Sequence, residues 1–306
     1  MQHIFRKSLF FSGLLVAGLV VGAHRLLAGL PDRQPLPDRR APVRFEPVRF
    51  DPRGFAPLTL AGAWRVTSAD PRMGGVSALA VDRGGLLALT DSGVTIRLPK
   101  PVAATGVAEF RDLPAGPGRG FYKAGRDSEA LTLDSGGRGW WVAFENHHSA
   151  WLFDRDLQRV IQKVDLEPLG WRANKGAEGA VSGRQGLLLF PEGGGEMVQF
   201  GSQGIRRTAL SNSVGRLADA SLLPDGRIVV LARSFSPAGF SSRLVLLDQA
   251  TLKPLARLAL GRLDNAEAIA AEPLAGGGVR LWVMTDNDFR RRVPTLLLAL
   301  DWTGRE

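Results

Sequence analysis

Five segments of this chain repeat one pattern: a short apolar stretch, a glycine-rich turn, and a second apolar stretch that ends in a polar residue. The pattern recurs about every 47 residues, a period typical of repeat architectures. The segments read GGVSALAVDRGGLLALTDSG (74–93), RDSEALTLDSGGRGWWVAFENH (126–147), KGAEGAVSGRQGLLLFPEGG (175–194), RLADASLLPDGRIVVLARSF (216–235) and NAEAIAAEPLAGGGVRLWVMTDND (265–288). Two apolar stretches joined by such a turn are typical of adjacent antiparallel strands. The repeat therefore predicts a fold built from similar β-units.

Further strand-like pieces lie between the repeated hairpins, for example AWLFD (150–154), EMVQF (196–200) and RLVLLD (243–248). Four strands in a repeat of about 45 residues are typical of a β-propeller blade. We expect a single all-β propeller of five four-stranded blades, or of six if another blade lies in the segment 99–126. An early strand at 57–66 would complete the last blade beside 295–302 and seal the ring.

The N-terminus predicts export. Two basic residues precede an uncharged apolar run that ends at Ala23. This run has the length of a signal-peptide core and is short for a membrane span. We expect a periplasmic or extracellular protein that meets the membrane only if its leader helix stays uncleaved. The expected domains are a signal peptide or N-terminal signal anchor at 1–23, a Pro- and Arg-rich tether at 24–42, and the propeller at 43–306.

Cysteine and charge limit the chemistry and the partners. The chain has no cysteine, which excludes disulfides, thiolate metal sites and a cysteine nucleophile. Its formal charge of +9 comes from scattered arginines, part of them in the tether. This balance favours small anionic, phosphorylated partners. No motif for nucleic-acid binding is present, so we expect no nucleic-acid partner, and we expect a monomer.

Hairpin geometry predicts that polar side chains gather at one end of the central channel. In an antiparallel hairpin, the start of the first strand lies beside the end of the second. Ring closure would bring these ends together at what we call the acidic mouth of the channel. The expected neighbours are Ser77 with Asp91, Glu129 with Glu145, Glu178 with Glu192, Asp219 with Arg233, and Glu267 with Asp286.

Crowded carboxylates require compensation by basic side chains or by a bound cation. Ca²⁺ prefers carboxylate oxygens and is the expected ion. The candidate catalytic residues are Glu129, Glu178 and Glu267; the candidate substrate-binding residues are Lys175, Arg233 and Arg126; the candidate metal ligands are Glu145, Asp286, Asp288 and Asp91. The structural alternative is that such residues bind backbone amides and lock neighbouring blades, and Asp134 is assigned to a turn.

Two other features of the second repeat suggest roles. Serine-hydrolase chemistry would need His147 or His148 as its base, with Ser128 or Ser77 as nucleophile, and the chain has no G-x-S-x-G motif. Adjacent strand residues face opposite sides. We therefore expect one of Trp140 and Trp141 in the core and the other outward, where it could contact a ligand.

The ordered motifs MGGVSAL, RDSEAL, NKGAEGA, LADASLLPDGR and DNAEAIA resemble those of the phytase-like family described as "esterase-like activity of phytase". The resemblance spans residues 43 to 302 and implies a β-propeller, export, and hydrolysis of ester or phosphoester bonds. The chain departs from the family pattern at Ala177, Ala266 and Ala268, and in TDNDFRRRVPT near its end. These changes keep the carboxylates and alter their surroundings.

Two functions from different classes fit these residues. One is a Ca²⁺-assisted hydrolase of phosphoesters or esters, with carboxylates as metal ligands and a lysine or arginine that neutralises developing charge. The other is a non-catalytic propeller that binds a ligand or partner at the same mouth, because fold alone does not fix function.

Overall fold

The computed structural model describes residues 35–118, 123–173, 175–211, 214–236, 239–261, 263, 265–287, 289 and 293–304. The predicted leader at 1–23 lies outside these residues. Within them, no helix has the length and apolarity that a membrane crossing requires. The first strand, β1, begins at Arg39, so the ring starts inside the segment predicted as a tether.

Three sheets of the ring have four antiparallel strands each, in the order of the chain. The first contains β7 (Ser128–Leu133), β8 (Gly139–Phe144), β9 (Ser149–Asp154) and β10 (Val160–Asp165). The second contains β11 (Ala177–Gly183), β12 (Gly186–Pro191), β13 (Glu196–Gly201) and β14 (Gly204–Ala209). The third contains β15 (Arg216–Leu222), β16 (Ile228–Ser236), β17 (Gly239–Leu247) and β18 (Pro254–Ala259).

The fourth sheet has nine strands and joins the two ends of the ring. Its order is β19 (Ala266–Pro273), β20 (Val279–Thr285), β21 (Leu296–Trp302), β2 (Thr59–Ser68), β1 (Arg39–Pro47), β6 (Thr105–Asp112), β5 (Val94–Leu98), β4 (Gly85–Thr90) and β3 (Val76–Asp82). β2 pairs with β21 as the sequence predicts, and β1 lies between β2 and β6. The number of blades depends on whether this sheet is counted once or as two halves that β1 joins.

Short helical segments connect the strands. They are η1 (Pro52–Phe55), α2 (Lys123–Arg126) and η2 (Glu167–Leu169). The segment 99–126, considered for a sixth blade, holds β6 and α2 in its described part. The all-β class and the four-stranded sheets are thus confirmed.

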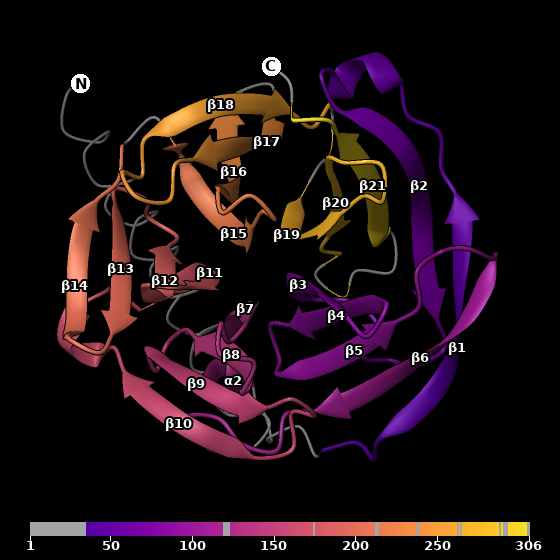
Figure 1. Cartoon of the computed structure of the whole chain (residues 1–306). Coiled ribbons are helices and arrows are strands. Elements are labelled where there is room, and N and C mark those ends of the chain that lie inside the picture. Colours follow the sequence, from indigo (N-terminus) through magenta and orange to yellow (C-terminus); the bar gives the residue numbers. More distant parts are fainter. Residues whose placement is uncertain are drawn as a thin grey trace, which may run out of the picture. The chain divides into compact units, whose positions relative to one another are not determined.

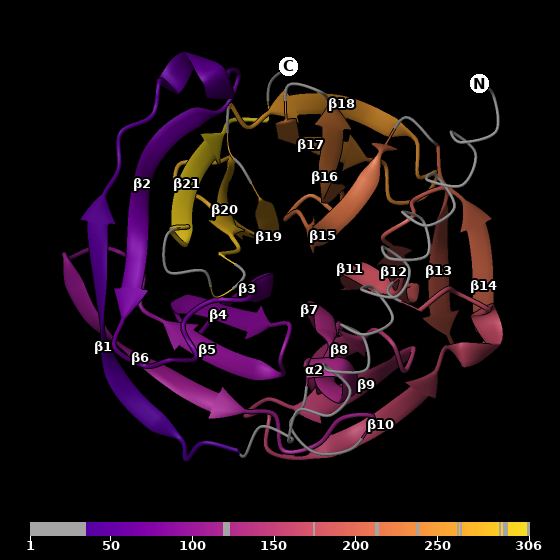
Figure 2. The ribbon, with the colours of Figure 1, turned by 180° about the vertical axis from the view of Figure 1, so that it is seen from behind.

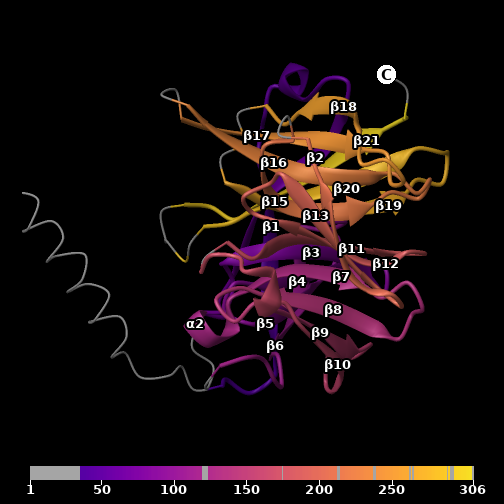
Figure 3. The same cartoon turned by 90° about the vertical axis from the view of Figure 1, so that its left-hand side faces the viewer.

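The innermost strands β3, β7, β11, β15 and β19 contact one another in a closed cycle, which Figures 1 and 2 show from opposite sides and Figure 3 shows from the side. Apolar side chains fill the space between neighbouring sheets, for example Leu231 against Ile269 and Val283. Strands buried on both faces read as continuous apolar runs. This explains sequences such as LLLFP in β12, whose last five residues are all buried.

Burial on both faces corrects the expectation for the tryptophan pair. Trp140 is 1% exposed and Trp141 is 3% exposed. They do lie in different core clusters, Trp140 with Leu87 and Leu89 and Trp141 with Leu187 and Leu189. Adjacent residues thus face opposite sides as predicted, but a neighbouring sheet covers each side. Neither indole is available to contact a partner.

Asp134 organises the turn between β7 and β8, as predicted. Its carboxylate accepts hydrogen bonds from the Gly136 N–H at 3.0 Å, from Arg138 Nη2 at 2.8 Å and from Trp141 Nε1 at 3.1 Å. The Arg138 hydrogen bonds are the largest cause that lowers the pKa of Asp134 to about 2. The turn is therefore fastened to the core through a charged group.

We expect Asp134→Asn to lower the free energy of unfolding by about 2 kcal/mol at pH 7. An unfolded Asp has a pKa of about 4, so the depressed pKa stabilises the fold above pH 4, and this stabilisation is lost as the pH falls through 2. Urea unfolding of both proteins at pH 7 and pH 3 measures the effect. A loss of equal size at both pH values would show that the carboxylate charge is not its source.

Candidate functional site

The polar residues that follow the second strand of each repeat lie at one rim of the channel. Each of four such residues donates its backbone N–H to a carbonyl just before the first strand: Asp91 to Gly75, Glu145 to Asp127, Glu192 to Gly176, and Asp286 to Asn265, at 2.6–3.0 Å. In the remaining repeat, Arg233 pairs with Arg216. The repeat thus places one residue of each hairpin at equivalent positions around the mouth, and an arginine replaces the acid once.

A second ring of residues lies one step deeper. Each innermost strand has a register shift that leaves one residue without a cross-strand partner. Such a bulge redirects the unpaired side chain. The bulged residues are Ser77, Glu129, Glu178, Ala218 and Glu267.

Asp219 is therefore one residue away from the position that the sequence comparison gives it. It is the first paired residue after the bulge, where the other strands have Ala78, Ala130, Gly179 and Ala268. Its carboxylate is fully buried. It accepts the N–H of Ala220 at 2.7 Å, the N–H of Ile269 at 2.7 Å, and the N–H of Leu79. Asp219 thus ties β15 to β19 and β3, which is the structural role considered as the alternative.

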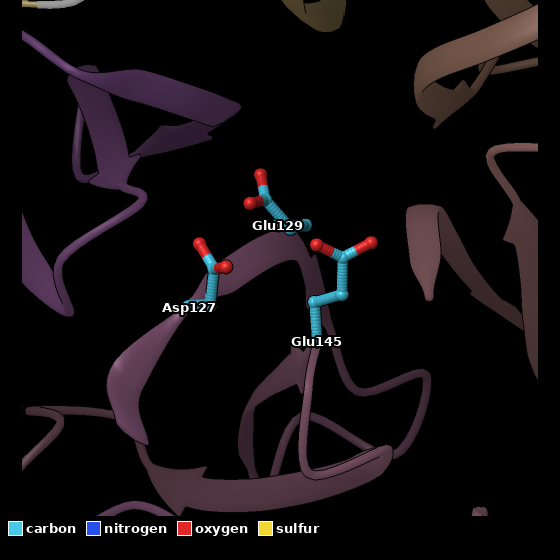
Figure 4. A group of neighbouring side chains, drawn as sticks. All are labelled: Asp127, Glu129 and Glu145. Carbon is cyan, nitrogen blue, oxygen red and sulfur yellow. The ribbon is translucent and has the colours of Figure 1, made fainter. Parts of the chain in front are cut away.

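Three carboxylates of the second repeat converge. One oxygen each from Asp127, Glu129 and Glu145 lies within 4.8 Å of the other two, and Figure 4 shows the three groups turned toward a common space. Asn146 Nδ2 donates to Asp127 Oδ2 at 2.7 Å, and the Gly176 N–H donates to Glu145 Oε1 at 2.8 Å. We call these three residues the carboxylate trio.

Glu178 on the next inner strand lies deeper in the channel. Its side chain is partly exposed, and protein atoms surround most of its carboxyl group. Burial raises the pKa of Glu178 well above its usual value, and the charges of Glu145, Glu267 and Glu192 add to this. Burial also raises the pKa of Glu145, and the Gly176 N–H opposes that effect. The mouth therefore carries more negative charge than its surroundings stabilise.

Basic side chains compensate the other side of the mouth. Lys175 and Arg216 both form ion pairs with Glu192, and Arg233 forms one with Glu267. Burial raises the pKa of Glu192, but the hydrogen bonds from Lys175 and Arg216 outweigh it, so this pKa is lowered. The cations thus gather near β11 and β15, while the carboxylate trio lies on the hairpin of β7 and β8.

Comparison with known proteins decides the family. The protein-family model described as "Phytase-like: Esterase-like activity of phytase" matches residues 71–289. The chain belongs to this family. Among curated proteins, none matches the phytase-like chain.

Solved structures with a similar arrangement have little sequence in common with the phytase-like chain. Glutaminyl cyclase of Myxococcus xanthus is 14% identical, with 74% of this chain and 91% of that chain covered and a TM-score of 0.49. The α-L-arabinofuranosidase PaAbf62A from Podospora anserina is 9% identical, with 86% and 98% covered and a TM-score of 0.44. Hydrazine synthase of Kuenenia stuttgartiensis is 12% identical, with 72% of this chain and 58% of that chain covered and a TM-score of 0.42.

The structure brings together only part of the predicted metal site. Glu145 belongs to the carboxylate trio, together with Glu129, which the sequence suggests as catalytic, and Asp127, which it places at the mouth. Asp91 and Asp286 occupy equivalent rim positions on other hairpins and do not join the trio. Asp288 lies outside the described residues.

Arg126 differs from the expectation of an anion-binding residue. Its side chain is buried, and Nη1 donates to the Leu113 carbonyl oxygen at 3.3 Å. Burial lowers the pKa of Arg126, and Asp112 opposes the effect. The first carbons of its side chain pack beside Gly93 and the guanidinium packs beside Gly116, so Arg126 supports the loop before α2. Arg216, in contrast, forms an ion pair with Glu192 at the acidic mouth. It is thus a basic residue of the mouth, the position that the sequence suggests for Arg126.

The serines and histidines considered for a hydrolytic triad have structural partners. Ser128 Oγ donates to the Thr90 carbonyl at 2.7 Å and accepts the Gly93 N–H at 3.1 Å. Ser77 Oγ donates to the Ser128 carbonyl at 2.6 Å. His148 is buried, and its Nε2 lies 3.2 Å from the Arg172 carbonyl oxygen. These contacts join β3 to β7 and fix a loop, and they form no Ser–His pair.

Proposed function

We propose that the acidic mouth hydrolyses a phosphoester or ester with the assistance of Ca²⁺ held by the carboxylate trio. The observation that carries this proposal is the convergence of Asp127, Glu129 and Glu145 within 4.8 Å at a mouth that also holds Lys175, Arg216 and Arg233. Such a mouth offers oxygen ligands to a hard cation and positive charge to an anionic substrate.

The donor set of the trio fits Ca²⁺ by its chemistry. Its ligand atoms are carboxylate oxygens. Burial is the largest cause that raises the pKa of Glu145, and repulsion from Asp127 raises it further. A cation between these groups would relieve the repulsion. Bound Ca²⁺ would supply a Lewis acid that polarises a phosphoryl or carbonyl oxygen.

The remaining residues of the mouth divide the other tasks. Lys175, Arg216 and Arg233 orient the anionic group of the substrate and neutralise the charge that develops on it. Burial raises the pKa of Glu178, which favours its protonated form, so Glu178 is the carboxyl of the mouth best suited to donate a proton to the leaving group. Glu267 holds Arg233 in place through its ion pair.

The test is hydrolysis of p-nitrophenyl phosphate, p-nitrophenyl acetate and phytate by the full chain, with Ca²⁺ and with a chelator. We expect turnover that needs Ca²⁺, and a kcat/KM at least roughly 100-fold lower for the double variant Glu129→Gln, Glu145→Gln. Ca²⁺ at 100 times its Kd should also stabilise the wild type by about 3 kcal/mol and leave the double variant unchanged.

Glu109→Gln is the matched control, because Glu109 is a half-exposed partner of Arg40 on β6, a strand separated from the innermost strand β3 by β5 and β4. It should keep both the activity and the response to Ca²⁺. Absence of turnover with all three substrates, together with no rise in melting temperature on adding Ca²⁺, would refute the proposal. A Ca²⁺ response without turnover would instead support the non-catalytic binding propeller.

A further inference from the structure

An aromatic side chain projects at the edge of the acidic mouth. Phe289 follows β20 in the connection to β21 and is 45% exposed. Among the Phe and Trp side chains whose exposure the structure describes, it is the only one that is exposed. Exposure of a large apolar side chain costs solvation free energy, so its place beside a charged site calls for an explanation.

The backbone holds Phe289 in this position at a conformational cost. Its φ is 53°, in the left-handed region that bulky residues rarely adopt. Such conformations concentrate at functional sites, where the surroundings enforce them. Here Asn287 enforces it, because its Oδ1 accepts the Phe289 N–H at 3.0 Å.

Two glycines form the seat of the phenyl ring. A Cβ atom on Gly75 would lie 2.3 Å from Phe289 Cε2 and 2.9 Å from Asp91 Oδ1. A Cβ atom on Gly74 would lie 3.2 Å from Phe289 Cδ1. Both glycines have positive φ, 142° at Gly74 and 62° at Gly75. One side of the ring therefore rests on bare backbone beside the Asp91 carboxylate, and the rest remains accessible.

Two of the basic side chains, Lys175 and Arg216, come from hairpins that do not neighbour the seat of the phenyl ring, whereas Arg233 reaches Glu267 on β19, which neighbours β3. Gly75 precedes β3, whose neighbours in the inner cycle are β7 and β19. Lys175 precedes β11, and Arg216 and Arg233 belong to β15 and β16. β11 and β15 are the two inner strands that are not adjacent to β3 in the cycle (Figure 1). A molecule whose anionic end meets Lys175 and Arg216 would extend its other end past the carboxylate trio toward Phe289.

Resting on the proposed function, we infer that Phe289 selects the leaving group, and that the substrate is a phosphoester of an aromatic or similarly flat apolar alcohol. An aromatic ring on the substrate can pack against the exposed part of the phenyl ring. A polyphosphorylated polyol has no apolar face to offer and would bring further anionic groups toward Asp91 and the trio. The geometry therefore favours a monophosphate with one apolar end.

The experiment separates binding of the apolar end from the chemical reactivity of the ester. Phenylphosphonate and methylphosphonate carry the same anionic group and are not hydrolysed. Calorimetric Kd values for both, in the presence of Ca²⁺, are measured with the wild type, Phe289→Ala, Phe289→Leu and Phe289→Tyr. Hydrolysis of phenyl phosphate and of ethyl phosphate is followed in parallel.

We expect the wild type to bind phenylphosphonate at least threefold more tightly than methylphosphonate. Phe289→Ala should remove this preference without changing the Kd of methylphosphonate. Phe289→Leu should keep part of the preference, and Phe289→Tyr should keep all of it. Val102→Ala, at a side chain that is 94% exposed, is the control for loss of surface apolar area. Melting temperatures show whether each variant is folded.

The outcomes distinguish the two proposals. If the wild type hydrolyses phenyl phosphate but Phe289→Ala and Phe289→Leu both keep the wild-type preference between the phosphonates, the inference about Phe289 is wrong and the proposed function stands. If the wild type binds neither phosphonate and hydrolyses neither ester, both are wrong. Equal losses for both phosphonates in Phe289→Ala would mean that the ring only supports the mouth, which also overturns the inference.

Discussion

Asp219→Asn is expected to lower the free energy of unfolding by about 3 kcal/mol, or the melting temperature by about 10 °C. Asp219 is fully buried and accepts backbone N–H groups from three inner strands. Asparagine has the same shape, but its amide nitrogen is a donor that would face a backbone N–H. This loses one hydrogen bond and places two donors together, whichever protonation state the native carboxyl has.

Thermal unfolding followed by circular dichroism measures this effect. Asp219→Ala, which introduces the residue found at three of the other four positions, should be destabilising too, because it leaves the N–H groups of Ile269 and Leu79 without this acceptor. Asp156→Asn, at an exposed ion pair with Arg83, should leave the melting temperature nearly unchanged, because solvent screens an exposed ion pair. A shift below 2 °C for Asp219→Asn would contradict the role of Asp219 as the tie between strands.

Glu178→Gln is expected to act in the opposite direction and to stabilise the protein at pH 8 in the presence of a chelator. Burial, followed by the charges of Glu145, Glu267 and Glu192, raises the pKa of Glu178 in the folded state. A carboxyl with a raised pKa contributes stability that is fully present below its unfolded value of about 4.5 and is lost as the pH rises through the folded pKa. Glutamine avoids that loss, because it never carries the charge.

The expected result at pH 8 is a higher melting temperature for Glu178→Gln than for the wild type, because ionisation of a carboxyl with a raised pKa costs stability there. At pH 4 the wild type and the variant should have the same stability. The same substitution should lower kcat, because it removes the proposed proton donor; stability and activity often oppose each other in this way. A Glu178→Gln protein that is less stable than the wild type at pH 8 would show that the ionised carboxylate is stabilised in the fold.

The fold was largely predictable because the repeat controls it. Alternating strands and glycine-rich turns are local signals, and the pairing of residues 57–66 with 295–302 followed from the need to close the ring. The burial of Trp141 could not be predicted from the sequence of its own strand. Its burial depends on the neighbouring sheet, which packs Leu187 and Leu189 against it, and alternation within one strand carries no information about that.

The candidate site was predictable only at the resolution of the hairpin. Strand ends give the rim, so Glu145 and Glu192 lie where expected. The inner positions depend on a bulge, which shifts the register by one residue without any gap in the sequence. In the sequence comparison Asp219 is therefore aligned with Glu129, whereas the residue that is structurally equivalent to Glu129 is Ala218. Alignment on the small residue that follows the bulge in four repeats would have revealed the difference, since Asp219 alone replaces it.

The way in which β1 and β2 close the ring has a consequence for the order of events during synthesis. Arg65 pairs with Leu296, so almost all of the described chain must be made before β2 meets its partner. Contacts between such distant segments form late, because the intervening chain has to be ordered first. β1 can pair early with β2 and β6, but the other edge of β2 stays unpaired until β21 is made. Until then the partly synthesised chain is an open ring, in which one edge of β2 has no partner strand.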